Sequence, residues 1–179
     1  IEKVHKSGAK FDFEKAKWFN HEWIKRSPVS TYRNEVKKIF EQKGLKIYDD
    51  RYLENVLELV KERCHLLGDF WEHSYFFFRT PNEFDVIPIK AKWNSHKKDF
   101  FYNYLKSLPA ISHWTADSLE TLFKRMAEES EIKPGELQLP LRIMLVGGKF
   151  GPPVFQIAEV LGKEETIARI KLALESFPS

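Results

Sequence analysis

The sequence predicts an all-α protein, and three observations favour this class. Apolar residues recur at helical spacing along most of the chain. Between these segments stand residues that begin or end helices, chiefly Asp, Ser, Gly and Pro. No pair of segments with alternating polar and apolar residues is joined by an Asn-Gly or similar tight turn, as β-hairpins require. We therefore expect two or three small helical units without internal repeats.

The first two helices are predicted from their ends. Asp12 precedes an apolar-periodic run and suits an N-cap, and Ser27–Pro28 should end this helix. A second helix is expected over about residues 30–43, with Gly44 in the position that follows a helix cap.

A third helix should follow Asp49 and Asp50, because negative charge suits a helix amino terminus. One face of it forms an apolar stripe, with Arg63 beside it, made of Leu53, Val56, Leu57, Val60 and Cys64. Gly68 should then bend the chain before an aromatic segment over residues 69–78. We expect this segment to be a short helix, and the bunched Phe residues leave a buried strand as the alternative.

Residues 79–93 contain two prolines and little periodicity, which is typical of a domain junction, and we place a boundary near Phe84. Pro140 should kink or split one of the helices that follow. These helices are expected over residues 95–108, 115–130 (behind the capping sequence TADS), 134–146, 152–161 and 163–176.

The composition is that of a soluble globular protein. The chain has 179 residues, of which 42% are hydrophobic and 31% are charged, enough for one domain or two small ones. Cys64 is the only cysteine, so no intrachain disulfide can form, and we expect a reducing, cytoplasmic location. No apolar run approaches a membrane span, and no signal peptide is recognised. Because the sequence begins at Ile1, we expect an excised piece of a longer protein or a processed product.

Positive charge is concentrated at the amino-terminal end. Residues 1–48 contain 12 Lys and Arg against 6 Asp and Glu, whereas residues 49–140 contain 12 against 16. A surface that binds phosphates has this kind of charge distribution. The alternative is an ordinary solvated helix face.

Two apolar helical segments meet across a Gly- and Pro-rich loop between residues 137 and 173, which contains the sequence GGKFGPP. Gly147, Gly148 and Gly151 can adopt positive φ, and the two prolines favour the start of a helix. The loop lacks the GK[ST] ending of a Walker loop, so it is not expected to bind a nucleotide phosphate. On its own, the stretch would be interpreted as a helix hairpin that completes a core.

Arg142 lies among apolar residues just before this loop. A guanidinium there needs a partner or an outward orientation, because burying it alone is unfavourable. An outward-facing arginine beside a rigid loop is well suited to contact nucleobases or phosphates, since its fork of donors matches planar acceptors.

Catalytic and metal-binding motifs are absent from the sequence. The six histidines show no spacing that would assemble a zinc site with each other or with Cys64. Cys64 and His65 are neighbours on a helix and point about 100° apart, so they cannot form a nucleophile and base pair. No GxSxG, HExxH, Walker or Rossmann motif occurs, which argues against an active site within this chain. The residues alone indicate a helical module, and its basic and aromatic side chains are of the kind that bind RNA.

Three segments together resemble the carboxy-terminal part of bacterial glutamyl-tRNA synthetases. They are KSGAKFDFEKAKWFNHEWI at residues 6–24, LVKERCHLLGDF at 59–70, and LPLRIMLVGGKFGPPVFQIAEVLGKEETIARI at 139–170. The resemblance extends over nearly the whole chain. It implies two small helical anticodon-binding domains, at residues 28–84 and 85–179, preceded by the end of a helical stem-contact region at residues 1–27.

The resemblance also implies functional residues. Arg63 matches an arginine that contacts the first anticodon base in this family, and Arg142 matches one that contacts the third. Gly151, Pro152 and Val154 match the loop that receives the second and third bases. Gly151 replaces a threonine of the family, so a backbone contact could persist there whereas a side-chain contact could not. An ion pair of Arg63 with Glu58 or Glu62 on the surface is the alternative.

The function implied by the resemblance is recognition of tRNA-Glu as part of an ATP-dependent aminoacyl-tRNA ligase. The HIGH and KMSK motifs of the catalytic domain are absent, so this chain alone is expected to be inactive and to need no cofactor. ATP and magnesium are expected for the full-length enzyme. We expect a monomer that does not bind DNA or membranes. A helical protein-interaction module is the alternative, and a stand-alone enzyme is a weaker one.

Overall fold

The computed structural model describes residues 12–177, which form ten α-helices and four short 3-10 helices. No β-strand occurs within this range, so the all-α prediction is confirmed. The α-helices are α1 (Phe13–Arg26), α2 (Arg33–Gln42), α3 (Asp50–Val60), α4 (Asp69–Ser74), α5 (Ile87–Lys90), α6 (Ser95–Ser107), α7 (Ala116–Glu129), α8 (Pro134–Val146), α9 (Val154–Leu161) and α10 (Lys163–Ser176). The 3-10 helices are η1 (Val29–Thr31), η2 (Lys61–Arg63), η3 (Tyr75–Phe77) and η4 (Leu108–Ala110).

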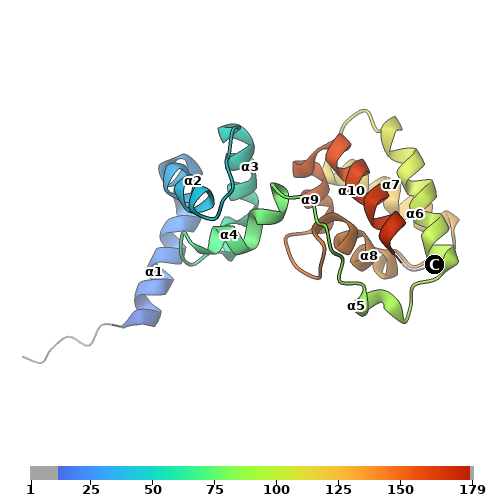
Figure 1. The fold of residues 1–179 in the computed structure, drawn as a ribbon, viewed down its shortest axis with the longest axis horizontal. Helices are drawn as coiled ribbons and strands as arrows, with labels where there is room; N and C mark the ends of the chain where they lie inside the picture. The colour runs from blue at the N-terminus through green and yellow to red at the C-terminus, as the bar shows by residue number, and fades with distance from the viewer. Residues whose placement is uncertain (1–11, 178–179) are drawn as a thin grey trace, which may run out of the picture.

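The helices form two lobes joined by an extended segment (Figure 1). We call residues 12–78 the first lobe, residues 79–86 the connector and residues 87–177 the second lobe. The start of the predicted stem-contact region, residues 1–11, and the last two residues lie outside the described range.

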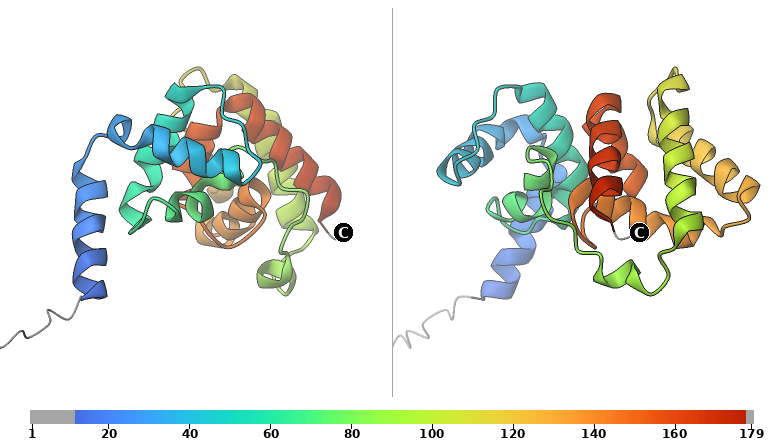
Figure 2. Two further views of the ribbon diagram at one scale, coloured as in Figure 1. Left: turned by 60° about the vertical axis from the view of Figure 1, so that its left-hand side comes forward. Right: turned by 45° about the vertical axis from the view of Figure 1, so that its right-hand side comes forward.

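Helix α1 begins and ends where its sequence predicts. The side chain of Asp12 accepts a hydrogen bond from the backbone N–H of Lys15 at 3.0 Å, and the helix ends at Ser27. The helix projects from the first lobe (Figures 1 and 2). Its aromatic rings do not all fill the core, since Trp18 and Phe19 are each 55% exposed.

The core of the first lobe is built on the predicted stripe of α3. Asp49 caps this helix by accepting from the N–H of Tyr52, and all five residues of the stripe are fully buried. Only four of them lie on α3, which ends at Val60, because Cys64 follows η2 in an extended conformation. Rings from α2 and α4 complete the packing, and those of Phe40 and Trp71 lie 5.4 Å apart in an edge-to-face arrangement.

Besides α3, two predicted helices of the first lobe are shorter than expected. The second begins at Arg33, because the preceding turn is the 3-10 helix η1. The aromatic segment forms α4 and then the 3-10 helix η3, and not a strand. A single strand here would have no neighbour to pair its backbone groups, whereas helical turns satisfy them locally and still bury Phe76 and Phe77.

The second lobe packs around Phe123 of α7. Its fully buried ring lies 5.2 to 5.3 Å from the rings of Phe100, Tyr104 and Phe155, so it joins α6, α7 and α9. Aromatic pairs in this geometry stabilise a core beyond the area that they bury.

Pro140 does not split α8, which runs unbroken from Pro134 to Val146. The proline removes one backbone donor. It is itself buried, and burial of the side chains on both sides of it, such as Leu137 and Leu141, holds the helix in place. A further difference is α5, a short helix within the segment expected to be irregular.

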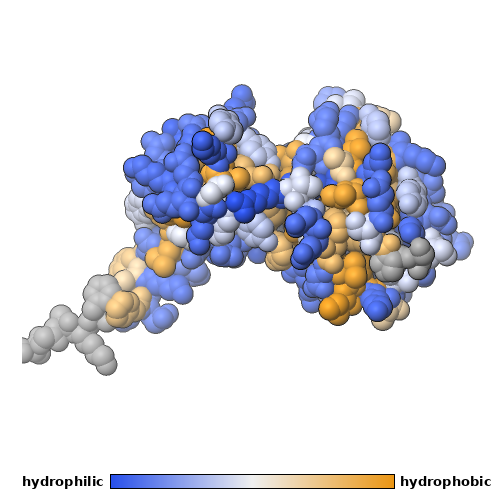
Figure 3. All heavy atoms as spheres, viewed as in Figure 1, coloured by the Kyte–Doolittle hydropathy of each residue, from blue (hydrophilic) through white to orange (hydrophobic). Residues whose placement is uncertain are grey.

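The surface shown in Figure 3 is largely hydrophilic over the first lobe, with hydrophobic residues exposed over parts of the second. Within residues 12–177, no helix combines the length and apolar character needed to cross a membrane.

Candidate nucleic-acid interface

The loop between α8 and α9 has a defined shape that depends on two glycines. Gly147 ends α8 with φ +84°, and Gly151 has φ +95°, which are conformations that favour glycine. Gly148 does not adopt positive φ. The loop also packs against the first lobe, because a Cβ placed on Gly151 would lie 3.2 Å from the ring of Phe76.

Arg142 holds this loop from the middle of α8. Its Nη1 donates to the backbone carbonyls of Phe150 at 3.0 Å, Gly151 at 3.2 Å and Pro152. The partners that the sequence required are therefore main-chain oxygens and not an acidic residue. Partial burial lowers the pKa of Arg142, and the positive charge of Arg63 lowers it further. The side chain as a whole is half-buried.

Arg63 occupies the last position of η2 in the first lobe, with its side chain exposed. It forms no ion pair within residues 12–177, and Glu58 pairs instead with Lys61. The electrostatic effect of Arg63 on Arg142 indicates that two of the predicted site residues lie near each other.

A hollow of about 480 Å³ lies between the two lobes, and two predicted site residues, Arg63 and Pro152, line it. The complete lining is Glu58, Leu59, Lys61, Glu62, Arg63, Pro152, Pro153 and Gln156. Arg142 does not line the hollow itself, but its Nη1 donates to the carbonyl of Pro152, which does. The structure therefore brings the two arginines to the same loop from different lobes.

Pro152 and Val154 are buried, and Gly151 is partly buried. Val154 is 4% exposed and begins α9, so its side chain belongs to the core of the second lobe. The first N–H groups of a helix have no partner within the helix, and Pro153 offers no side-chain cap for them. These donors, next to the hollow, suit a negatively charged or carbonyl-bearing ligand.

Sequence analysis missed Arg169 and Gln156. Gln156 is exposed on α9 and lines the hollow. Arg169 is 1% exposed in α10, and its contacts are described below. A signal for Arg169 was present, because it falls on the same helical face as the apolar Ile170 and Ala173.

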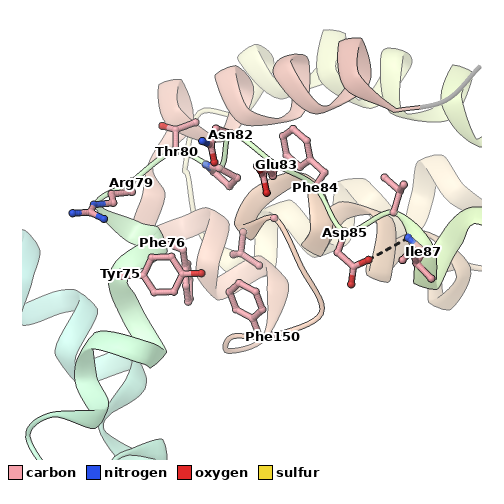
Figure 4. Close-up of a pocket in the computed structure, with 14 residues that line it drawn as sticks. Tyr75, Phe76, Arg79, Thr80, Asn82, Glu83, Phe84, Asp85, Ile87 and Phe150 are labelled. Atoms are coloured by element: carbon pink, nitrogen blue, oxygen red, sulfur yellow. Dashed lines mark hydrogen bonds between the residues drawn. The ribbon is translucent and has the colours of Figure 1, made fainter. Parts of the chain in front are cut away.

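A second hollow, of about 980 Å³, lies beside the connector (Figure 4). Tyr75, Phe76 and Phe150 lie together at one side of it, with the rings of Phe76 and Phe150 5.5 Å apart. Arg79 points away, donating to the carbonyl of Lys43 and lying over the ring of Trp71. None of the five predicted site residues lines this hollow.

Two helical lobes with arginines around the α8–α9 loop agree with a family match. The chain belongs to the family described as "Anticodon binding domain", whose model matches residues 15–174.

Within residues 12–177, no group of three or more His, Cys, Asp or Glu residues is arranged to hold a metal ion.

Glutamate–tRNA ligases are among the relatives of this chain. That of Christiangramia forsetii is 37% identical over 176 residues, and that of Porphyromonas gingivalis is 35% identical over 175. The match covers 98% of this chain in both cases, but only 35% and 34% of the relatives. A crystal structure of a glutamate tRNA ligase from Elizabethkingia meningosepticum in complex with its amino acid superposes with a TM-score of 0.83 at 32% identity. The superposition covers 97% of this chain and 34% of the other.

The chain thus spans about a third of the length of these relatives. The resemblance to glutamyl-tRNA synthetases is confirmed, and the alternative of a protein-interaction module is not favoured.

Proposed function

We propose that this chain recognises the anticodon of tRNA-Glu as the carboxy-terminal part of a glutamate–tRNA ligase. The family match and the glutamate–tRNA ligases among its relatives support this assignment. The attachment of glutamate, with its requirement for ATP and magnesium, would take place in a catalytic part outside this chain. No residue described above is assigned to that chemistry.

The observation that carries the proposal is that Arg63 and Pro152, from different lobes, line one hollow. Sequence-specific RNA recognition targets unstacked bases, which are held by arginines, aromatic planes and main-chain groups. An anticodon loop presents such bases, and this hollow offers an exposed guanidinium, a side-chain amide and the amino-terminal end of α9.

In the proposed arrangement, Arg63 contacts the first anticodon base and Arg142 the third. Gly151 and Pro152 contribute main-chain groups. The buried side chain of Val154 anchors the end of the loop in the core of the second lobe. We further propose that residues 28–84 and 85–179 are the two anticodon-binding domains and that α1 belongs to the stem-contact region.

The test is binding of RNA hairpins that carry the tRNA-Glu anticodon stem and loop, with each anticodon base changed in turn. Arg63→Gln should reduce discrimination at the first base by about 1–3 kcal/mol, as expected for loss of a bidentate arginine contact. Arg51→Gln is the matched control, because Arg51 is also an exposed arginine of the first lobe but lies at the other end of α3.

Equal losses for the two variants would show that Arg63 acts only through its charge. Affinity should also fall as salt is raised, with a slope of about −0.7 per phosphate contact on a logarithmic scale. If no hairpin is preferred and binding does not respond to salt, the proposed function is wrong.

A further inference from the structure

A buried arginine contributes to the contact between the two lobes, beside the packing of α3 on α9 and of Phe76 on Phe150. Arg169 of α10 is 1% exposed, and its Nη1 donates to the carbonyl oxygens of Phe76 and Leu145, each at 2.7 Å. Its Nε donates to Oε1 of Glu165 at 2.6 Å. The same carboxylate oxygen accepts from the hydroxyl of Thr80 at 2.8 Å.

These partners come from three separate parts of the chain. Phe76 lies in η3 at the end of the first lobe, Thr80 lies in the connector, and Leu145 lies in the last turn of α8. The last carbonyls of an α-helix have no partner within it, so Arg169 completes the end of α8 while holding the neighbouring lobe. We call Arg169, Glu165 and Thr80 the arginine clamp.

The arginine clamp contacts both sides of the candidate interface, the first lobe through Phe76 and α8 through Leu145. Leu145 is three residues beyond Arg142 on α8, and Phe76 underlies the loop at Gly151. Arg63 is carried by the first lobe, to which Phe76 belongs. The position of the first lobe relative to α8 therefore determines the separation between Arg63 and the loop.

The geometry of the guanidinium favours this role. Its planar fork fixes direction as well as distance, whereas a lysine ammonium is a point charge on a flexible stem. Both lobe contacts are made to backbone oxygens, which cannot change rotamer. Deep burial keeps water from replacing them.

We propose that Arg169 is a positioning residue for anticodon recognition, setting the distance between Arg63 and the loop that Arg142 holds. This proposal rests on the proposed function, but the distance that Arg169 sets between the lobes can be measured without RNA. Arg169 itself is too buried to contact a nucleotide.

The first measurement is the distance between the lobes. Spin labels on Lys38→Cys in α2 and Glu128→Cys in α7 would report it by pulsed electron paramagnetic resonance, since both positions are exposed. Cys64 is fully buried, so the labels should go to the introduced cysteines. The parent should give one narrow distance distribution, and Arg169→Lys and Arg169→Met should broaden it.

The second measurement is selectivity among the anticodon hairpins. Without the bonds of Arg169, the packing of Phe76 on Phe150 and of α3 on α9 holds the lobes less rigidly, and the distance between Arg63 and the loop varies. The Arg169 variants should therefore bind the matched hairpin at least tenfold more weakly and lose most of the preference at the first base. Should Arg169→Met fail to fold, Thr80→Val removes only the bond between the connector and Glu165 and should give the same changes to a smaller extent.

Thr166→Val is the control for general loss of stability. Thr166 is also buried in α10, but it donates to the carbonyl of Ala158 within the second lobe. This variant should lower the melting temperature while the distance distribution and the selectivity stay as in the parent.

The positioning proposal is overturned if the Arg169 and Thr80 variants keep a narrow distribution, or if the distribution broadens and the selectivity is unchanged. A parent that binds no hairpin selectively would instead contradict the proposed function. In that case the distance distributions alone still test whether the clamp fixes the lobes.

Discussion

Gly151 has a conformation and a location that leave little room for any side chain. Its φ of +95° is unfavourable for other residues, and an added Cβ would lie 3.2 Å from both Phe76 and Ile157. We expect Gly151→Thr to reduce the free energy of unfolding by at least about 1–2 kcal/mol, from the backbone conformation alone. Urea denaturation measures this change.

Gly135→Ala is the matched control for this substitution. Gly135 lies near the start of α8 without positive φ, and an added Cβ there meets nothing within 4 Å. Its replacement should leave stability unchanged or raise it by up to about 1 kcal/mol. If Gly151→Thr behaves like Gly135→Ala, the loop does not have the backbone described above.

Arg142 illustrates how far a single residue can be interpreted from sequence. Its apolar neighbours indicated that the guanidinium needs either a partner or an outward orientation. The structure combines the two, because one nitrogen binds loop carbonyls while the residue stays partly exposed. Which acceptors it finds depends on how the loop folds back, and local sequence does not contain that information.

At the scale of single helices, α10 should make stability depend on pH. Burial alone would raise the pKa of Glu165, but hydrogen bonds from Arg169 and Thr80 outweigh it, and the net pKa lies below the ordinary value. A carboxylate whose pKa is lower in the folded state stabilises the fold above its unfolded pKa. This contribution is lost as the pH falls through the folded value.

We therefore expect the free energy of unfolding to decrease between about pH 5 and pH 3, with Glu165 contributing part of the decrease. Glu165→Gln removes that ionisation, so the difference in stability between parent and variant should shrink as the medium is acidified. Urea denaturation at a series of pH values measures it. A difference that is constant with pH would contradict the lowered pKa.

The helices that sequence predicted well are those whose ends are determined locally. Asp12, Asp49 and Thr115 each accept a hydrogen bond from the backbone three residues later, and such caps depend on short sequence patterns. The 3-10 helix η3 and the short helix α5 were not foreseen, because their form depends on packing with distant parts of the chain. The unbroken α8 has the same explanation, since its burial offsets the missing donor at Pro140.

For the molecule as a whole, the second lobe depends on its shared aromatic core. Phe123→Ala should lower the free energy of unfolding by about 3–5 kcal/mol, because a fully buried ring that joins three helices is lost. Tyr102→Ala, at a 40% exposed ring on α6, should change it by no more than about 0.5 kcal/mol. Equal effects on denaturation would mean that Phe123 is not central to the core.

The global arrangement was predictable only through resemblance. Helical spacing in the sequence indicated small helical units, but no local pattern indicates that Arg63 and Pro152 line the same hollow. Their sequence separation means that the contact depends on how the lobes pack. The position of Arg169 on the apolar face of α10 points to burial, but it does not show that the guanidinium meets carbonyl oxygens of both lobes.

The three carbonyl bonds of Arg142 have a thermodynamic consequence. They order the Gly- and Pro-rich loop in the free protein, so the conformational entropy of that segment is already lost on folding. A nucleotide that arrives there meets a preorganised receptor and need not freeze a mobile one. The conformational entropy lost on association should then come mainly from the RNA.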